Sequence, residues 1–154
     1  MKKYELTDEY IEIGFTTKIK LYRIKALVAI ASIGVSAGDL GGYVEKESNL
    51  DQSGDAWVYD NAVVSGDAEV CGDAKVYGDA KVSERSDIVW FSNVGTEYGT
   101  LTVFKTKQGV LWATRGCFSG SVEEFLKKSA EIHDEKTKRE YQLLIEVAKS
   151  RLNN

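Results

Sequence analysis

The sequence contains no proline, two cysteines and a single histidine among its 154 residues. Cys71 and Cys117 are too few for a disulfide framework, as is typical of a protein in a reducing cytoplasm. The longest apolar run, Ala26–Val35, spans ten residues, whereas a membrane helix needs about 20. Residues 1–5 carry positive charge but no apolar segment follows them, so we expect no signal peptide. We therefore expect a cytoplasmic location and no membrane partner.

Positive charge is scarce in the middle of the chain. The net charge is −4, with 43% hydrophobic and 29% charged residues, which is typical of one ordinary globular domain. Residues 39–93 carry twelve acidic and four basic groups, whereas residues 1–38 and 94–120 are each net +2 and residues 121–154 are neutral. Binding of nucleic acid needs a basic stripe, and the acidic middle segment would repel a phosphate backbone. We therefore expect no nucleic-acid partner.

A six-residue repeat occupies this acidic segment. Triplets of Gly-Asp-Ala or Asp-Asn-Ala begin at residues 54, 60, 66, 72 and 78, and a valine stands two residues after each alanine. About ten units, weaker at both ends, fit between Leu40 and Gly99. Six is not a helical period, and it suits short strands joined by turns in which Gly, Asp and Asn supply the backbone conformation. Calcium repeats also contain aspartates, but their period is nine, so we expect no metal site here.

An aliphatic residue followed four positions later by a small one resembles the hexapeptide repeat of left-handed parallel β-helices. Three units there make one triangular coil of eighteen residues, so ten units predict about three coils. Residues eighteen apart should then lie on neighbouring coils, about 4.8 Å from each other. The pairs expected are Trp57 over Lys75, Tyr59 over Tyr77 and Val63 over Lys81.

Both ends of the chain depart from the repeat. Alternating residues predict a β-hairpin over Tyr4–Leu27, and a second hairpin joins Thr100–Phe104 to Val110–Thr114. Two helices should follow. We divide the chain into an N-terminal hairpin cap (1–38), a hexapeptide β-helix (39–99) and a C-terminal cap of hairpin and helices (100–154), because open solenoid ends need covering.

The start of the first helix has its own signal. Ser121 with Glu124 three residues later forms a capping box. Helical spacing places apolar residues of both helices inward, the second helix beginning near Asp134. The residues expected inward are Val122, Phe125, Leu126, Ile132, Tyr141, Leu144, Ile145, Ala148 and Leu152.

Several stretches resemble phage- and prophage-encoded hexapeptide-repeat proteins, which are labelled polymer-forming cytoskeletal proteins or transferases. The resemblance implies a phage protein that acts in the host cytoplasm and forms a homo-oligomer, with a trimer favoured. Both family labels rest on the repeat alone, which is an argument from fold. The matching stretches are residues 4–9, 21–27, 38–45, 99–102, 115–120 and 123–125, besides the repeats.

Few residues offer catalytic chemistry. Hexapeptide acyltransferases, which the repeat also resembles, use a histidine base, but His133 lies outside the repeat at the junction of the two expected helices. Cys117 could act as a nucleophile with His133 as base and Arg115 nearby, although no third orienting group is identifiable, and packing in a tight turn is the alternative. No Cys/His cluster has metal spacing, and no glycine-rich motif binds a cofactor. We assign no catalytic residue, metal or cofactor.

Binding is the function that the sequence favours. Trp57, Tyr59 and Tyr77 form either a stacking platform for a ligand ring or a surface covered by a terminal segment or subunit. Arg115 could hold a phosphate-bearing ligand if the two hairpins meet across subunits and bring basic residues together, and scattered solvated charge is the alternative. We therefore expect a non-enzymatic protein that acts on a host protein or sequesters a small molecule, for example in counter-defence. The alternatives are a hexapeptide-type acyltransferase and a self-assembling scaffold. The other basic residues considered are Lys18, Lys20, Arg23, Lys25, Lys105 and Lys107.

Overall fold

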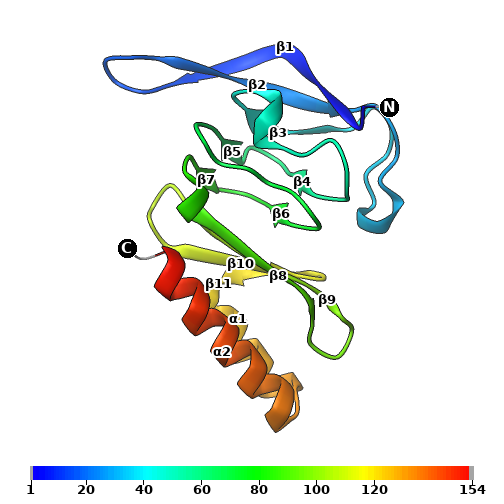
Figure 1. Cartoon of the computed structure of the whole chain (residues 1–154), viewed down its shortest axis with the longest axis vertical. Coiled ribbons are helices and arrows are strands. Elements are labelled where there is room, and N and C mark those ends of the chain that lie inside the picture. Colours follow the sequence, from blue (N-terminus) through cyan, green and yellow to red (C-terminus); the bar gives the residue numbers. More distant parts are fainter. Residues whose placement is uncertain (1, 153–154) are drawn as a thin grey trace.

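The computed structural model describes residues 2–152. Within them the chain forms eleven β-strands, three short 3-10 helices and two α-helices. A long hairpin lies at one end of the elongated molecule, short strands fill its middle, and a sheet covered by two helices forms the other end (Figure 1). No helix in this described part is long and apolar enough to cross a membrane.

A five-stranded mixed sheet begins with the N-terminal hairpin. Strands β1 and β2 pair antiparallel, which confirms the predicted hairpin, and β2 pairs antiparallel with β3. Strands β3, β5 and β7 are then parallel. The strands in spatial order are β1 (Tyr4–Ile13), β2 (Ile19–Ala26), β3 (Leu40–Val44), β5 (Val63–Val64) and β7 (Lys81–Val82).

The eighteen-residue register of the repeat is confirmed. Strands β4 (Trp57–Val58) and β6 (Lys75–Val76) form a separate parallel pair in which Trp57 lies opposite Lys75. Val63 lies opposite Lys81 in the five-stranded sheet. The alanines and valines of the repeat point inward, and each of the five regular units contributes a buried alanine. This column forms the centre of the larger hydrophobic core.

The predicted left-handed parallel β-helix of about three coils is nevertheless wrong. The chain forms separate sheets that are mixed, antiparallel and two-stranded parallel, rather than one parallel solenoid. The repeat strands are only two residues long, because turns with a left-handed glycine, such as Gly66 after β5 and Gly78 after β6, begin soon after them. After the 3-10 helix η3 (Arg85–Asp87), strand β8 (Ile88–Val94) leaves the parallel arrangement and pairs antiparallel with β9 (Gly99–Lys105). The expectation of a mainly β chain with two C-terminal helices agrees with the structure.

The C-terminal sheet covers the open edge of the short strands. Its order is β11-β10-β9-β8 and it is antiparallel throughout, and its β9–β10 pair confirms the second predicted hairpin. Thr102 Oγ1 accepts a hydrogen bond from Lys75 N at 3.2 Å, and Thr114 Oγ1 donates one to Lys75 O at 3.0 Å. Exposed edges are templates for further pairing, so these threonines end the parallel arrangement at β6. The remaining bounds are β10 (Leu111–Arg115) and β11 (Phe118–Ser121).

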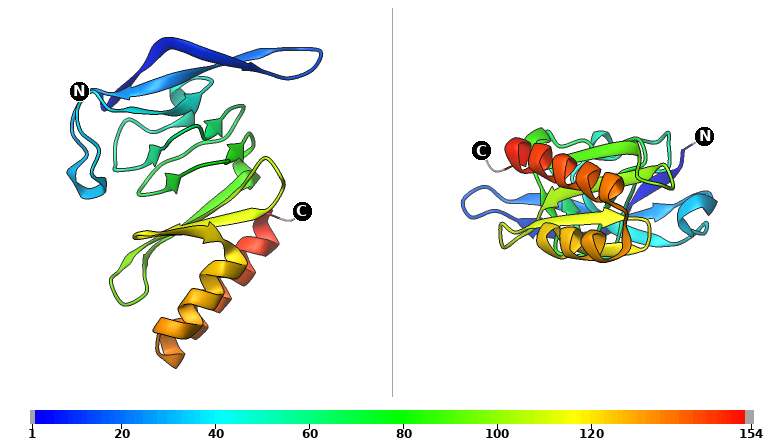
Figure 2. Two further views of the ribbon diagram at one scale, coloured as in Figure 1. Left: turned by 180° about the vertical axis from the view of Figure 1, so that it is seen from behind. Right: turned by 90° about the horizontal axis from the view of Figure 1, so that it is seen from below.

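Two helices cover the far face of this sheet (Figure 2). Helix α1 (Val122–Ile132) starts at the predicted capping box, in which Glu124 N donates to Ser121 Oγ and Ser121 N donates to Glu124 Oε1. Helix α2 (Glu135–Leu152) buries Tyr141 and Ile145 in a second core. Ile132 is 61% exposed, so its expected inward position is wrong. The two remaining 3-10 helices are η1 (Ala31–Ile33) and η2 (Glu47–Asn49).

Candidate functional site

The most chemically diverse pocket lies at the C-terminal end of the molecule. It has a volume of about 310 Å³ and is bounded by the β8–β9 turn, the β10–β11 turn and the junction of α1 and α2. Basic, thiol and aromatic side chains meet there. We call it the C-terminal pocket, and the lining residues that matter below are Arg115, Cys117, Phe125, Lys128, His133 and Tyr141.

Arg115 ends strand β10 and is held in place within the pocket. Its Nε donates a hydrogen bond to the hydroxyl of Tyr141 at 2.9 Å. A Cβ at Gly99 would lie 2.9 Å from Arg115 Cζ, and one at Gly95 would collide with the Tyr141 hydroxyl. Because both positions lack a side chain, the guanidinium can lie across the β8–β9 turn. Gly95 N is fixed in turn by a 2.7 Å bond to Glu140 Oε1 on α2.

Helix α1 brings a second cation to the pocket. Lys128 is exposed and lies one turn after the buried Phe125, so both side chains reach the same side of the helix. Neither Lys128 nor Arg115 takes part in the salt bridges found among residues 2–152. One carboxylate, that of Glu97, lines the same pocket. Two cations against one carboxylate leave positive charge available to a ligand.

His133 stands directly after α1 and is half-buried. Its Nδ1 lies 2.8 Å from the hydroxyl of the buried Ser129, and its ring centroid is 5.3 Å from that of Tyr141. The imidazole thus has one nitrogen engaged inside the helix and packs on an aromatic ring. His133 also lines the C-terminal pocket, and its second ring nitrogen is a further hydrogen-bonding group of the side chain.

Cys117 lies in the turn between β10 and β11 and is exposed. The turn is tight, because Arg115 pairs with Phe118 across it and Gly116 has a left-handed φ of 57°. The structure does bring Cys117, Arg115 and His133 to one pocket, as the sequence suggested. Among the described residues, however, no hydrogen bond joins the thiol to the imidazole, whose partner is Ser129.

The predicted aromatic site is only partly assembled. Tyr59 and Tyr77 stack with centroids 4.0 Å apart and an interplanar angle of 5°, which confirms their expected contact. Burial, then the neighbouring Tyr77 hydroxyl, raises the pKa of Tyr59 far above its usual range. Trp57 does not join them on the surface, because it is 1% exposed and its ring meets that of Tyr4 edge-on at 6.2 Å. Whether the tyrosine stack binds a ligand ring stays a prediction.

Within one chain, the basic residues Arg23 and Lys105 of the two hairpins lie away from Arg115, so their expected meeting across subunits stays a prediction. Arg23 bonds Glu9 Oε2 through Nε at 2.8 Å and lies over the ring of Tyr43. Lys105 forms an ion pair with Asp87 at 3.3 Å. Neither side chain lines the C-terminal pocket, so within one chain the partner of Arg115 is Lys128 rather than a residue of either hairpin.

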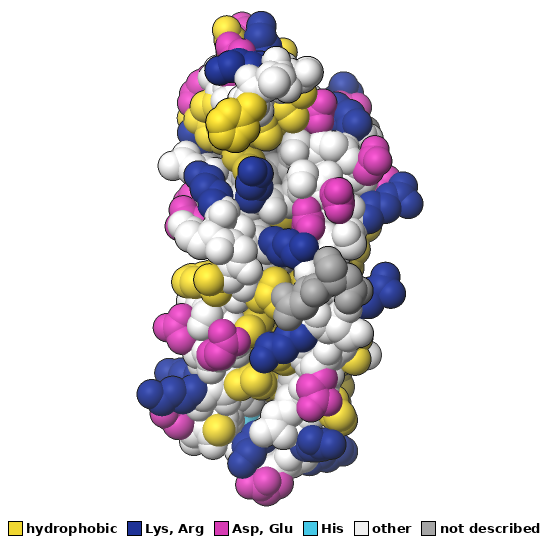
Figure 3. All heavy atoms as spheres, turned by 90° about the vertical axis from the view of Figure 1, so that its left-hand side faces the viewer, with side chains coloured by type: hydrophobic (Ala, Val, Ile, Leu, Met, Phe, Trp, Pro, Cys, Tyr) yellow, Lys and Arg dark blue, Asp and Glu magenta, His cyan; other side chains and the backbone are white. Residues whose placement is uncertain are grey.

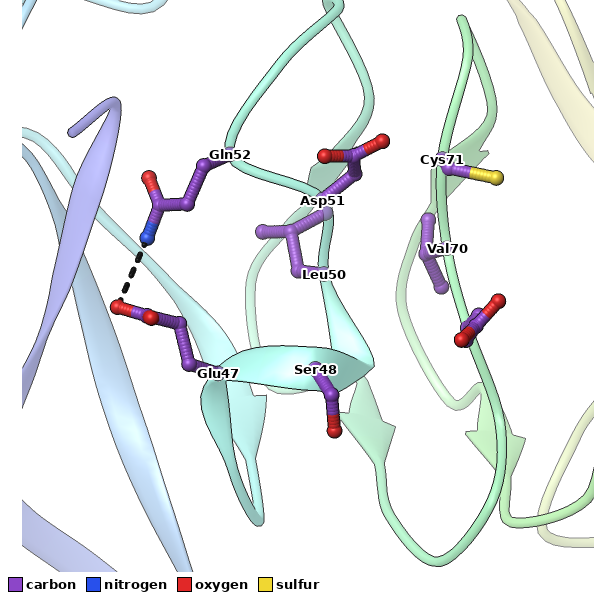
Figure 4. A pocket seen from close by; sticks show the side chains of 8 residues that line it. Glu47, Ser48, Leu50, Asp51, Gln52, Val70 and Cys71 are labelled. Atoms are coloured by element: carbon purple, nitrogen blue, oxygen red, sulfur yellow. Dashed lines mark hydrogen bonds between the residues drawn. The ribbon is translucent and has the colours of Figure 1, made fainter. Parts of the chain in front are cut away.

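A second pocket has the opposite charge. It has a volume of about 470 Å³ and lies beside η2, where Glu47, Asp51 and Glu69 line it together with Cys71 (Figure 4). Burial first, and then Asp51 and Glu69, raise the pKa of the Cys71 thiol, so the reactive thiolate is disfavoured. The carboxylates would repel an anion, and no group of residues within 2–152 has the arrangement of a metal site.

Lys128 was missed by the sequence analysis, although a signal for it exists. Phe125, Lys128, Ser129 and Ile132 follow helical spacing from the capping box, which places them on one side of α1. The apolar residues of this set were recognised, and the polar ones between them were not. That this helical side faces Arg115 depends on how α1 docks against β10.

No model of a protein family matches the chain, and no curated protein matches it either. The function proposed below is therefore inferred from the residues of the C-terminal pocket.

Proposed function

We propose that this protein is a binding protein that holds a small phosphate-bearing molecule in the C-terminal pocket. One observation carries the proposal: Arg115 and Lys128, neither of them in a salt bridge within residues 2–152, line the same pocket of about 310 Å³. Guanidinium and ammonium groups are the usual partners of phosphate oxygens. The volume is at the lower end of the range for small-molecule sites.

The walls of the pocket suit the rest of such a ligand. Phe118 is half-buried, and Ile132 exposes 61% of its surface beside it. Ligand sites are commonly apolar with a few charged groups that fix orientation. An organic phosphate could place its charged end on the two cations and its apolar part on these side chains. No lysine or arginine lines the acidic pocket near η2.

The arrangement favours binding over catalysis. Hexapeptide acyltransferases use a histidine base of the repeat, whereas His133 stands directly after α1, outside the repeat. A cysteine nucleophile needs an activating base, and the thiol of Cys117 lacks a hydrogen bond to His133 among the described residues. Acyl transfer and a structural scaffold remain the alternatives from the sequence. The kinship with phage proteins, the host setting and the cytoplasmic location stay predictions.

Titration calorimetry with inorganic phosphate, pyrophosphate and adenosine diphosphate tests the proposal, with adenosine as the probe that lacks phosphate. We expect at least one phosphate compound to bind, adenosine not to bind, and Lys128→Glu to weaken binding by about tenfold or more. Lys127→Glu is the matched control, because Lys127 is an equally exposed neighbour outside the pocket. The affinity should also fall as salt is raised.

Three results would contradict the proposal. One is the absence of saturable binding for all three phosphate compounds. Another is equal weakening by Lys127→Glu and Lys128→Glu, which would show only a general charge effect. The third is binding of adenosine as tight as that of its diphosphate, since the two cations would then contribute nothing.

A further inference from the structure

The hairpin of β1 and β2 extends as an arm beyond the rest of the molecule (Figures 1 and 2). Phe15 at its tip is 102% exposed, and Tyr10 and Ile11 on β1 are 46% and 36% exposed. A space-filling view shows hydrophobic side chains gathered at this end of the molecule (Figure 3). The turn at the tip requires a glycine at position 14, because a Cβ at Gly14 would collide with the carbonyl of Thr17. Together these side chains form an exposed apolar surface, and covering a fully exposed phenyl ring with another apolar surface is favourable.

The chain itself carries a pocket that fits this ring. A cavity of about 420 Å³ lies between the turn at Gly78 and the β9–β10 hairpin, with Val110 and Trp112 as its apolar walls. Val110 is 44% exposed, and Trp112 is half-buried against the larger core. The pocket exceeds a phenyl ring in size, and aromatic rings gain from packing edge-on or offset on an indole. Hot spots of interfaces are typically such aromatic anchors in apolar pockets.

Charge and direction are also complementary. Lys18 follows Phe15 in the arm and is exposed, while Asp79 is exposed at the rim of the pocket. The tips of the β1–β2 and β9–β10 hairpins point to the same side of the molecule in both views (Figures 1 and 2). Each molecule can therefore give an arm and receive one from a neighbour on that side.

We propose that this face binds a second copy of the chain, with Phe15 of each copy seated between Val110 and Trp112 of its neighbour. Reciprocal exchange closes a dimer, and exchange around a ring closes the trimer that the family resemblance implies. In either case every arm is buried and no free tip is left. The proposal does not depend on the C-terminal pocket, because none of these residues lines it.

Light scattering coupled to size exclusion measures the mass of the wild type and of three variants. We expect a dimer or trimer for the wild type and a monomer for both Phe15→Ser and Val110→Asp, since one removes the anchor and the other places a charge in the pocket. Tyr98→Ser is the control, because Tyr98 is 72% exposed in another hairpin turn, and it should keep the wild-type mass. Circular dichroism checks that all variants remain folded.

Each remaining result overturns the proposal. A wild type that is monomeric at the highest concentration loaded shows that the arm has no partner copy. A folded Phe15→Ser variant with wild-type mass removes the arm from the interface. Loss of assembly in Phe15→Ser but not in Val110→Asp assigns the ring to another surface, and loss in Tyr98→Ser shows a general effect of exposed aromatic rings.

Discussion

Asp87 joins the short parallel strands to the C-terminal sheet, and its removal should lower stability measurably. Its Oδ2 accepts hydrogen bonds from Ser83 N at 3.0 Å, Ser83 Oγ at 3.2 Å and Glu84 N at 3.0 Å. Its Oδ1 forms an ion pair with Lys105 Nζ on β9 at 3.3 Å. The residue is only 6% exposed. In Asp87→Ala two partly buried backbone donors would lose their acceptor.

The magnitude follows from these bonds. Each buried donor left without a partner costs about 1–3 kcal/mol. Lys105 is partly exposed and can rehydrate, so its share is small. Because the two donors are only partly buried, the lower end of this range applies to each. We therefore expect Asp87→Ala to lower the free energy of unfolding by about 2 kcal/mol, which corresponds to about 4–8 °C in Tm for a chain of this size. Asp87→Asn keeps an acceptor oxygen but loses the charge, and should cost about half as much.

The pH dependence distinguishes the carboxylate from simple packing. Burial by itself raises the pKa of Asp87, but the hydrogen bonds from Ser83 and Glu84 and the charge of Lys105 outweigh it, so the net pKa is lowered. A lowered pKa means that this stabilisation is fully present above the unfolded pKa of about 3.9 and is lost as the pH falls through the lower folded pKa. The stability difference between wild type and Asp87→Asn should therefore shrink as the pH falls below about 4.

Urea unfolding followed by circular dichroism from pH 7 to pH 3 measures both effects. Ser86→Ala is the control, because its hydroxyl is exposed and makes only a 3.5 Å contact with Glu84. If Asp87→Ala lowers the free energy of unfolding by less than about 0.5 kcal/mol, the contribution assigned to these hydrogen bonds is refuted. A difference between wild type and Asp87→Asn that stays constant across the whole pH range would refute the electrostatic argument.

Two further substitutions test the packing of the repeat region by thermal unfolding. Trp57→Ala should cost about 4 kcal/mol, as expected for deleting a buried aromatic side chain, and a loss under about 1 kcal/mol would mean that Trp57 is not the core residue seen here. Gly42→Ala should cost about 2 kcal/mol by overpacking, because its Cβ would lie 2.5 Å from Ala62 O and 2.6 Å from Val58 Cγ1. Gly78→Ala meets no atom and strains only a φ of 61°, so it should cost about half as much; the reverse order would contradict the close approach at Gly42.

Some features of the fold were predictable because they depend on neighbours in the sequence. The alternation of Ile11 and Ile13 and of Ile19 and Leu21 predicted the N-terminal hairpin, and Ser121 with Glu124 predicted the start of α1. The pairing of residues eighteen apart was also predictable, because three six-residue units with similar turn residues bring the chain back to the same face. In each case the determining interactions lie within one repeat or one turn.

The sequence by itself did not decide where the parallel strands stop. Ile88 and Val94 continue the aliphatic column of the repeat, yet β8 pairs antiparallel with β9. Two-residue strands offer few hydrogen bonds, whereas β8 and β9 are seven residues each and gain a longer ladder. Competition between these pairings is settled by non-local contacts, which a repeat pattern does not contain.

The candidate site, too, was predictable from the sequence only in part. The sequence alone predicted two hairpins and two helices, and it places Arg115 and Cys117 within one short segment of the acidic chain's C-terminal part. Only the tertiary structure placed Lys128 in the same pocket as Arg115 and buried Trp57 against Tyr4. The physical reason is that a side chain's exposure and charged neighbours depend on which helices and strands dock together, which a local sequence pattern does not contain.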